Sequence, residues 1–142
     1  MPYTSVASMT VQFSEAEIIA VSDRGKVGGI DDAAVEQAIA EGDAEIDSYL
    51  SIRYVTPVEA PIPARLANIA GDIARYHLHD RKPPELVVER YNRALATLRD
   101  MAQGKQNLEG ALQLSGDEAT HDVPSFVSVT NDWSRTNRGW NY

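Results

Sequence analysis

The stretch of sequence that decides the fold is residues 32–53, DAAVEQAIAEGDAEIDSYLSIR. Its apolar positions recur at spacings of three and four, the pattern of a helix with one buried face. Asp31 is placed to cap this helix, and Asp32 lies in the first turn, where negative charge is favourable. Gly42 costs about 1 kcal/mol relative to alanine inside a helix, so it predicts close approach of another helix. The stripe consists of Val35, Ala38, Ile39, Gly42, Ile46, Tyr49, Leu50 and Arg53.

Three further helices are expected around this one. Ser14 and Glu17 have the spacing of a capping box, which predicts a short helix to about residue 21. Pro63 can start a third helix with an apolar stripe over residues 66–77, and a fourth is expected from about residue 85 to Gly104, a suitable C-terminal cap. The short break at residues 81–84 makes the third and fourth helices an antiparallel pair. The fold class is therefore mainly α, a small helical bundle with a short first helix and three longer ones.

Outside these helices the chain is expected to be extended. The pattern divides the chain into an N-terminal extension (1–13), a helical core (14–104) and an extended C-terminal arm (105–142). Residues 125–130, SFVSVT, have the bias of a strand, which could be contributed to a sheet because one strand cannot stand alone. Large aromatic and arginine side chains dominate protein interfaces. They make Phe126, Trp133, Arg135, Arg138, Trp140 and Tyr142 candidate partner contacts, with a clasp onto the arm's own domain as the alternative.

Composition narrows the class of protein. The chain has 142 residues, about one domain, and a net charge of −8, which argues against a general nucleic-acid binder. It contains no cysteine, no apolar run long enough for a membrane span, and no basic, apolar signal sequence at residues 1–9. These features predict a soluble protein that folds in a reducing cytoplasm, with no membrane association.

The charge is distributed unevenly. Residues 1–51 contain ten acidic and two basic residues, residues 52–105 six acidic and nine basic, and residues 106–142 five acidic and two basic. Such asymmetry can be satisfied within the fold or between neighbouring copies arranged head to tail. Asp47 lies beside core positions, so we expect it to form a structural ion pair, with Arg75 as the preferred partner.

The sequence gives little support for catalysis or metal binding. His77 and His79 are two residues apart and point to different faces of a helix, which argues against a metal site with Asp80. No nucleophile motif or phosphate loop is present, so we expect no enzyme activity, metal or cofactor. A small DNA-binding or regulatory protein of helical type is the alternative, although Glu85 and Glu89 would repel phosphates at the start of a recognition helix.

Several short motifs occur together in one order along residues 9–108. They are Asp43-Ala44-Glu45-Ile46-Asp47-Ser48-Tyr49-Leu50, Arg53-Tyr54 with Pro57, Ile73-Ala74-Arg75-Tyr76, Glu89-Arg90-Tyr91, Ala94-Leu95, Leu98 and Gly104-Lys105. In order and spacing this set resembles the small neck protein family of Mu-like phages and prophages. The resemblance implies a virion protein of the head-to-tail connector or adaptor type, with no catalytic residues to carry over.

The resemblance further implies a homo-oligomeric ring at the phage neck, assembled in the bacterial cytoplasm. Its expected partners are the portal protein and a tail-side neck or terminator protein, with DNA passing through without specific binding. A ring needs heterologous contacts, and the uneven charge supplies two unlike surfaces. We hypothesise that the acidic face formed by Asp32, Glu36 and Asp43 lines the channel or the seam between subunits.

Overall fold

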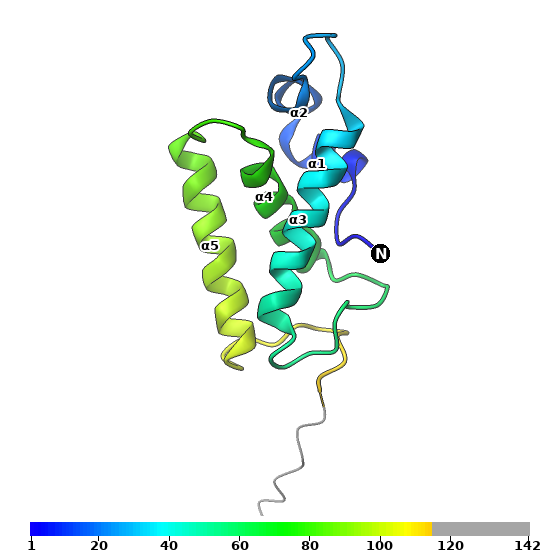
Figure 1. The fold of residues 1–142 in the computed structure, drawn as a ribbon. Coiled ribbons are helices and arrows are strands. Elements are labelled where there is room, and N and C mark those ends of the chain that lie inside the picture. Colours follow the sequence, from blue (N-terminus) through cyan, green and yellow to red (C-terminus); the bar gives the residue numbers. More distant parts are fainter. Residues whose placement is uncertain (115–142) are drawn as a thin grey trace, which may run out of the picture.

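The structure, a computed structural model, describes residues 1–114 and is mainly helical, as predicted. Its helices are α1 (Val6–Phe13), α2 (Glu15–Ser22), α3 (Asp32–Leu50), α4 (Ala64–Leu78) and α5 (Glu85–Ala102) (Figure 1). Within residues 1–114 there is no strand longer than an isolated bridge between Tyr54 and Gln113. The strand expected at residues 125–130 lies outside the described residues.

Helix α1 occupies the segment that the sequence analysis assigned to an N-terminal extension. Ser5 caps it, since the Ser8 N–H donates to the Ser5 hydroxyl at 3.2 Å. Met9 and Phe13 are buried in a cluster shared with α3 and α4. The helical core therefore begins before residue 14, because these apolar side chains share one face of a short helix.

The predicted N-cap side chains of α2 and α3 are confirmed, but the reciprocal half of the capping box is not formed, because the Ser14 N–H donates to the Thr10 carbonyl and the Glu17 carboxylate pairs with Arg75. The Glu17 N–H donates to the Ser14 hydroxyl at 3.4 Å, and the Ala34 N–H donates to the Asp31 carboxylate at 3.2 Å. Helix α3 ends at Leu50, three residues earlier than expected. The chain turns there because the N–H groups of Arg53 and Tyr54 both donate to the Leu50 carbonyl.

Helix α3 lies at the centre of the bundle and packs most extensively on α4. A Cβ atom at Gly42 would lie 3.2 Å from Cγ2 of Ile73 and 3.4 Å from the backbone nitrogen of Ala74. The close helix approach predicted from Gly42 is thus confirmed, and its partner is α4. Helix α5 runs antiparallel to α4 and forms the flank of the bundle opposite α1 and α2 (Figure 1).

Two groups of buried side chains make up the core. One joins the lower parts of α3, α4 and α5 to Tyr3, Tyr54, Val58 and Leu108. The other joins α1 and α2 to the N-terminal half of α3 and the C-terminal half of α4. Because both groups use α3 and α4, this helix pair is the frame on which the other elements are placed.

Candidate functional site

Helix α3 carries the largest net charge among the helices of residues 1–114, with six carboxylates and no basic residue. The hypothesis of one acidic face named Asp32, Glu36 and Asp43. Asp32 and Glu36 are exposed, whereas Asp43 is half-buried beneath the N-terminal segment. The remaining carboxylates divide between that side of the helix and the side that faces α4 and α5. The structure therefore supports an exposed acidic surface only along the N-terminal half of α3.

Tyr3 ties the N-terminus to α3. Its ring is buried, and its backbone N–H donates to the Asp43 carboxylate at 3.2 Å. Its hydroxyl donates to Asp47 and accepts the backbone N–H of Val58 at 2.9 Å. One side chain thus joins the N-terminal segment, α3 and the connection between α3 and α4.

Burial changes the acid–base behaviour of this cluster. Desolvation raises the pKa of Asp43 to about 6, and the neighbouring charge of Asp47 acts in the same direction. The Tyr3 N–H opposes this shift because it stabilises the ionised carboxylate. Burial, followed by the hydrogen bond to Asp47, also holds the pKa of the Tyr3 hydroxyl well above its usual range. The phenol therefore remains a proton donor to Asp47 at neutral pH.

A groove runs between the N-terminal segment and α3. Its walls are mainly apolar, and Glu36, Asp43 and Asp47 supply the negative charge along it. The other lining residues are Met1, Pro2, Thr4, Ser5, Val6, Ile39, Ala40, Ala44 and Pro57. This groove brings together Glu36 and Asp43 of the predicted acidic face, but not Asp32.

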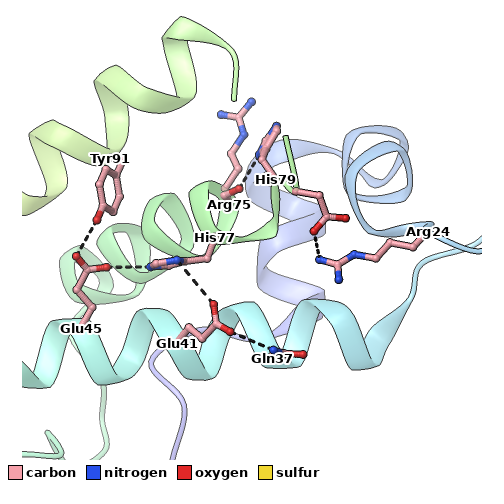
Figure 2. Close-up of polar contacts among 9 residues, drawn as sticks. Arg24, Gln37, Glu41, Glu45, Arg75, His77, His79 and Tyr91 are labelled. Carbon is pink, nitrogen blue, oxygen red and sulfur yellow. Dashed lines mark hydrogen bonds and ion pairs between the residues drawn. The ribbon is translucent and has the colours of Figure 1, made fainter. Parts of the chain in front are cut away.

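The opposite side of α3 forms a second polar cluster (Figure 2). Glu45 accepts a hydrogen bond from the Tyr91 hydroxyl at 2.8 Å and contacts Nε2 of His77 at 2.9 Å. Glu41 lies 3.8 Å from Nδ1 of the same ring. The Tyr91 ring also stacks on Tyr76, with 3.9 Å between ring centroids. Burial and the adjacent Glu45 raise the pKa of Tyr91, so this hydroxyl also remains protonated.

The predicted ion pair between Asp47 and Arg75 is not formed. Arg75 instead pairs with Glu17, and its guanidinium lies 4.6 Å from the centroid of the Phe13 ring. The side chains of Asp47 and Arg75 point to different parts of the fold, because Asp47 contacts Tyr3 while Arg75 contacts α1 and α2. Arg75 therefore fastens the N-terminal helices to α4.

His77, His79 and Asp80, which the sequence analysis considered as a metal site, each contact a different partner. The Nδ1 atom of His79 donates to the Arg75 carbonyl at 2.8 Å (Figure 2). Asp80 pairs with Arg24 at 2.6 Å. His77 contacts the α3 carboxylates described above. Among residues 1–114, no group of three or more histidine or carboxylate side chains is arranged to hold a metal ion.

The sequence analysis missed Tyr3, Glu17, Glu45 and Tyr91 as polar contacts that hold the fold. For the buried face of α1 a signal was present, because Val6, Met9 and Phe13 follow helical spacing. For Tyr3 no local pattern identifies its partners, which are 40 or more residues away. The candidate partner contacts Phe126, Trp133, Arg135, Arg138, Trp140 and Tyr142 lie outside the described residues.

No helix in the described part of the chain is both long and apolar enough to span a bilayer.

Comparison with known proteins places the chain among phage proteins. A family model described as "Bacteriophage Mu, Gp36" matches residues 3–125. The chain is similar to Gene product J of Escherichia phage Mu, with 25% identity over 141 residues and 99% of each chain covered. It is also similar to the Mu-like prophage FluMu protein gp36 of Haemophilus influenzae, with 33% identity over 115 residues and 78% of each chain covered. These matches confirm the resemblance to proteins of Mu-like phages and prophages: the chain belongs to the bacteriophage Mu Gp36 family.

Proposed function

We propose that this phage protein is a structural, non-enzymatic subunit of a ring at the phage neck. The ring would join the portal of the capsid to the tail and leave a channel for DNA. In this role the protein contacts copies of itself, the portal and a tail-side neck or terminator protein. It is assembled in the bacterial cytoplasm and becomes part of the virion.

The observation that carries this proposal is a difference in charge between two flanks of one bundle. The acidic groove and the exposed Asp32 and Glu36 belong to α3, which has no basic residue. On α5 the exposed Arg90, Arg93 and Arg99 balance three acidic residues, and Arg90 and Arg93 pair with Asp72 and Glu89. Figure 1 shows α5 on the flank away from the N-terminus. Two unlike surfaces on opposite sides suit a heterologous contact, which closes into a ring when the rotation between copies allows it.

The role of the acidic surface within the ring follows the same reasoning. Carboxylates along a channel would repel phosphates and keep passing DNA from binding. Carboxylates at a seam would attract the arginines of the next copy. The groove favours the seam, because its apolar walls would be covered by a neighbouring subunit.

The test is electron microscopy and native mass measurement of the purified protein, alone and mixed with portal. Ring particles seated on the portal are the expected result. A protein that never associates with itself or with portal contradicts the proposal. Retention of duplex DNA with a steep salt dependence would favour the DNA-binding alternative.

Single substitutions distinguish an acidic surface at the seam between subunits from an acidic surface that lines the channel. Glu36→Lys should weaken ring formation if the acidic surface lies at a seam, whereas Glu15→Lys, a charge reversal at an exposed site on α2, should not. A ring that forms normally with Glu36→Lys but retains DNA would place this surface in the channel. A ring structure with Asp32, Glu36 and Asp43 facing outer solvent would refute both versions.

A further inference from the structure

Residues 53–55 and 112–114 form a two-stranded contact at the end of the bundle where the described chain ends (Figure 1). Tyr54 and Gln113 face each other in an antiparallel bridge. The Val55 N–H donates to the Leu112 carbonyl at 2.8 Å, and the Leu114 N–H donates to the Arg53 carbonyl at 2.8 Å. The contact is thus a minimal β-ribbon fastened to the helical core.

The outward face of this ribbon is apolar. Tyr54 points into the core and is only 1% exposed, and side chains alternate along a strand, so its neighbours point the other way. Val55, Leu112 and Leu114 on this outer face are 42%, 67% and 47% exposed. Arg53 shares the face, but its guanidinium donates to Asn107 and lies 6.0 Å from the centroid of the Tyr54 ring. A solvent-facing sheet surface is normally polar. Three exposed apolar side chains on one face of the ribbon indicate a surface that is covered in use.

The ribbon also has an open edge. Within residues 1–114, neither the N–H nor the C=O of Gln113 makes a hydrogen bond. The ladder bonds flank this residue at Leu112 and Leu114, so its own backbone groups point away from residues 53–55. An exposed edge with apolar neighbours is a template for pairing with a further strand.

We propose that residues 125–130 of a neighbouring copy of this chain add as a third strand to the Gln113 edge. Their sequence, SFVSVT, has the β-branched and aromatic composition of a strand. Val127 and Val129 are two residues apart and share one face of an extended chain, so both can lie on the outer face beside Leu112 and Leu114. The added strand would satisfy the Gln113 backbone groups and partly cover the side chains of Leu112 and Leu114, which lie next to it in the sheet.

The length of the connecting segment favours a neighbouring copy. Ten residues, 115–124, separate Leu114 from this strand. Hairpin loops have about 2–5 residues, so a return to the same edge would need an unusually long loop. Extended, the ten residues span about 33 Å, enough to reach an adjacent subunit. The edge of one copy and the strand of the next form a heterologous contact that repeats around a ring, so the inference rests on the proposed function.

Two full-length variants test the proposal by each breaking one half of the contact. Gln113→Pro removes the N–H of the edge, and Val127→Asp places a charge in the added strand. Native mass measurement on samples equilibrated at high salt, where a contact through the charges of α3 is screened, should show that the parent associates with increasing concentration and that each variant alone is monomeric. An equal mixture of the two variants should form a dimer and nothing larger, because only one intact edge meets one intact strand.

Matched controls keep the result interpretable. Gln113→Ala retains the backbone N–H and should associate like the parent, as should Thr120→Asp, which adds a charge within the connecting segment. Helical circular dichroism checks that every variant folds. If Gln113→Pro loses helix, Leu112→Asp on the exposed outer face replaces it as the edge variant.

Three outcomes would overturn the inference. The first is a parent that stays monomeric at all concentrations, the second is a variant mixture without a dimer, and the third is full association of both single variants. A portal-bound ring that forms with either variant refutes the strand exchange and leaves the neck role standing. A dimer from the mixture, with no ring on portal, supports the strand exchange and contradicts the neck role.

Discussion

Replacing Tyr3 by phenylalanine tests whether one N-terminal side chain holds the bundle together. The change removes a hydroxyl that donates to Asp47 and leaves the buried N–H of Val58, which it accepts at 2.9 Å, without a partner. A hydrogen bond to a charged group contributes about 1.5–3 kcal/mol, and an unsatisfied buried donor costs about 1–3 kcal/mol. Because Asp47 is only half-buried and can regain water, we expect a net loss of about 2–4 kcal/mol.

Urea unfolding followed by helical circular dichroism measures this loss. The unfolding midpoint should fall while the slope stays constant, since the surface exposed on unfolding does not change. The melting temperature should fall by about 6–12 °C for a domain of this size. Tyr49→Phe is the matched control, because no hydrogen bond of its hydroxyl is present among residues 1–114, and it should change stability by less than about 0.5 kcal/mol. A Tyr3→Phe midpoint equal to that of the parent would refute the proposed clasp.

Two further predictions concern charge. Because burial raises the folded pKa of Asp43 from its ordinary value of 3.8 to about 6, the folded state binds more protons between these values, and this group's contribution to stability falls as pH rises through that window. Asp43→Asn should therefore flatten the pH dependence of the urea midpoint between about pH 4 and 6. A double-mutant cycle with Glu17→Gln and Arg75→Gln should show coupling of about 1–2 kcal/mol, while Asp47→Asn and Arg75→Gln should be additive within about 0.5 kcal/mol. Strong coupling in the second cycle would restore the pair predicted from the sequence.

The parts of the fold that could be predicted are those determined by local periodicity. Helices α3, α4 and α5 each present an apolar stripe long enough to distinguish a helix from a strand. Gly42 indicated the close approach of another helix, which the structure identifies as α4. Helix α1 has eight residues, too few for its stripe to stand out from an irregular N-terminus. Its existence depends on burial against α3 and α4, which only the tertiary structure supplies.

The polar contacts could not be predicted for a related reason. Six acidic side chains project from α3, and sequence spacing does not determine which of them meets a given partner. Asp47 was a reasonable candidate for Arg75 because both lie beside core positions. The choice of Glu17 depends on how α2 is placed over the C-terminal half of α4, and that placement follows from packing of Phe13 and Ile18. The choice is therefore a property of the assembled bundle.

The carboxylates of α3 that already have partners inside the fold are less available for contacts with another subunit. Asp43 and Asp47 hold the N-terminal segment, and Glu41 and Glu45 contact His77 or Tyr91, so these four carboxylates already have partners inside the fold. Asp32 and Glu36 make no side-chain hydrogen bond or ion pair among residues 1–114, and both are exposed. An electrostatic contact with a neighbouring copy would thus depend mainly on the first turns of α3. The lower end of the bundle, with its apolar ribbon, would contribute a contact that salt does not weaken. Assembly through both surfaces should therefore retain a salt-resistant part even when the charges of α3 are screened.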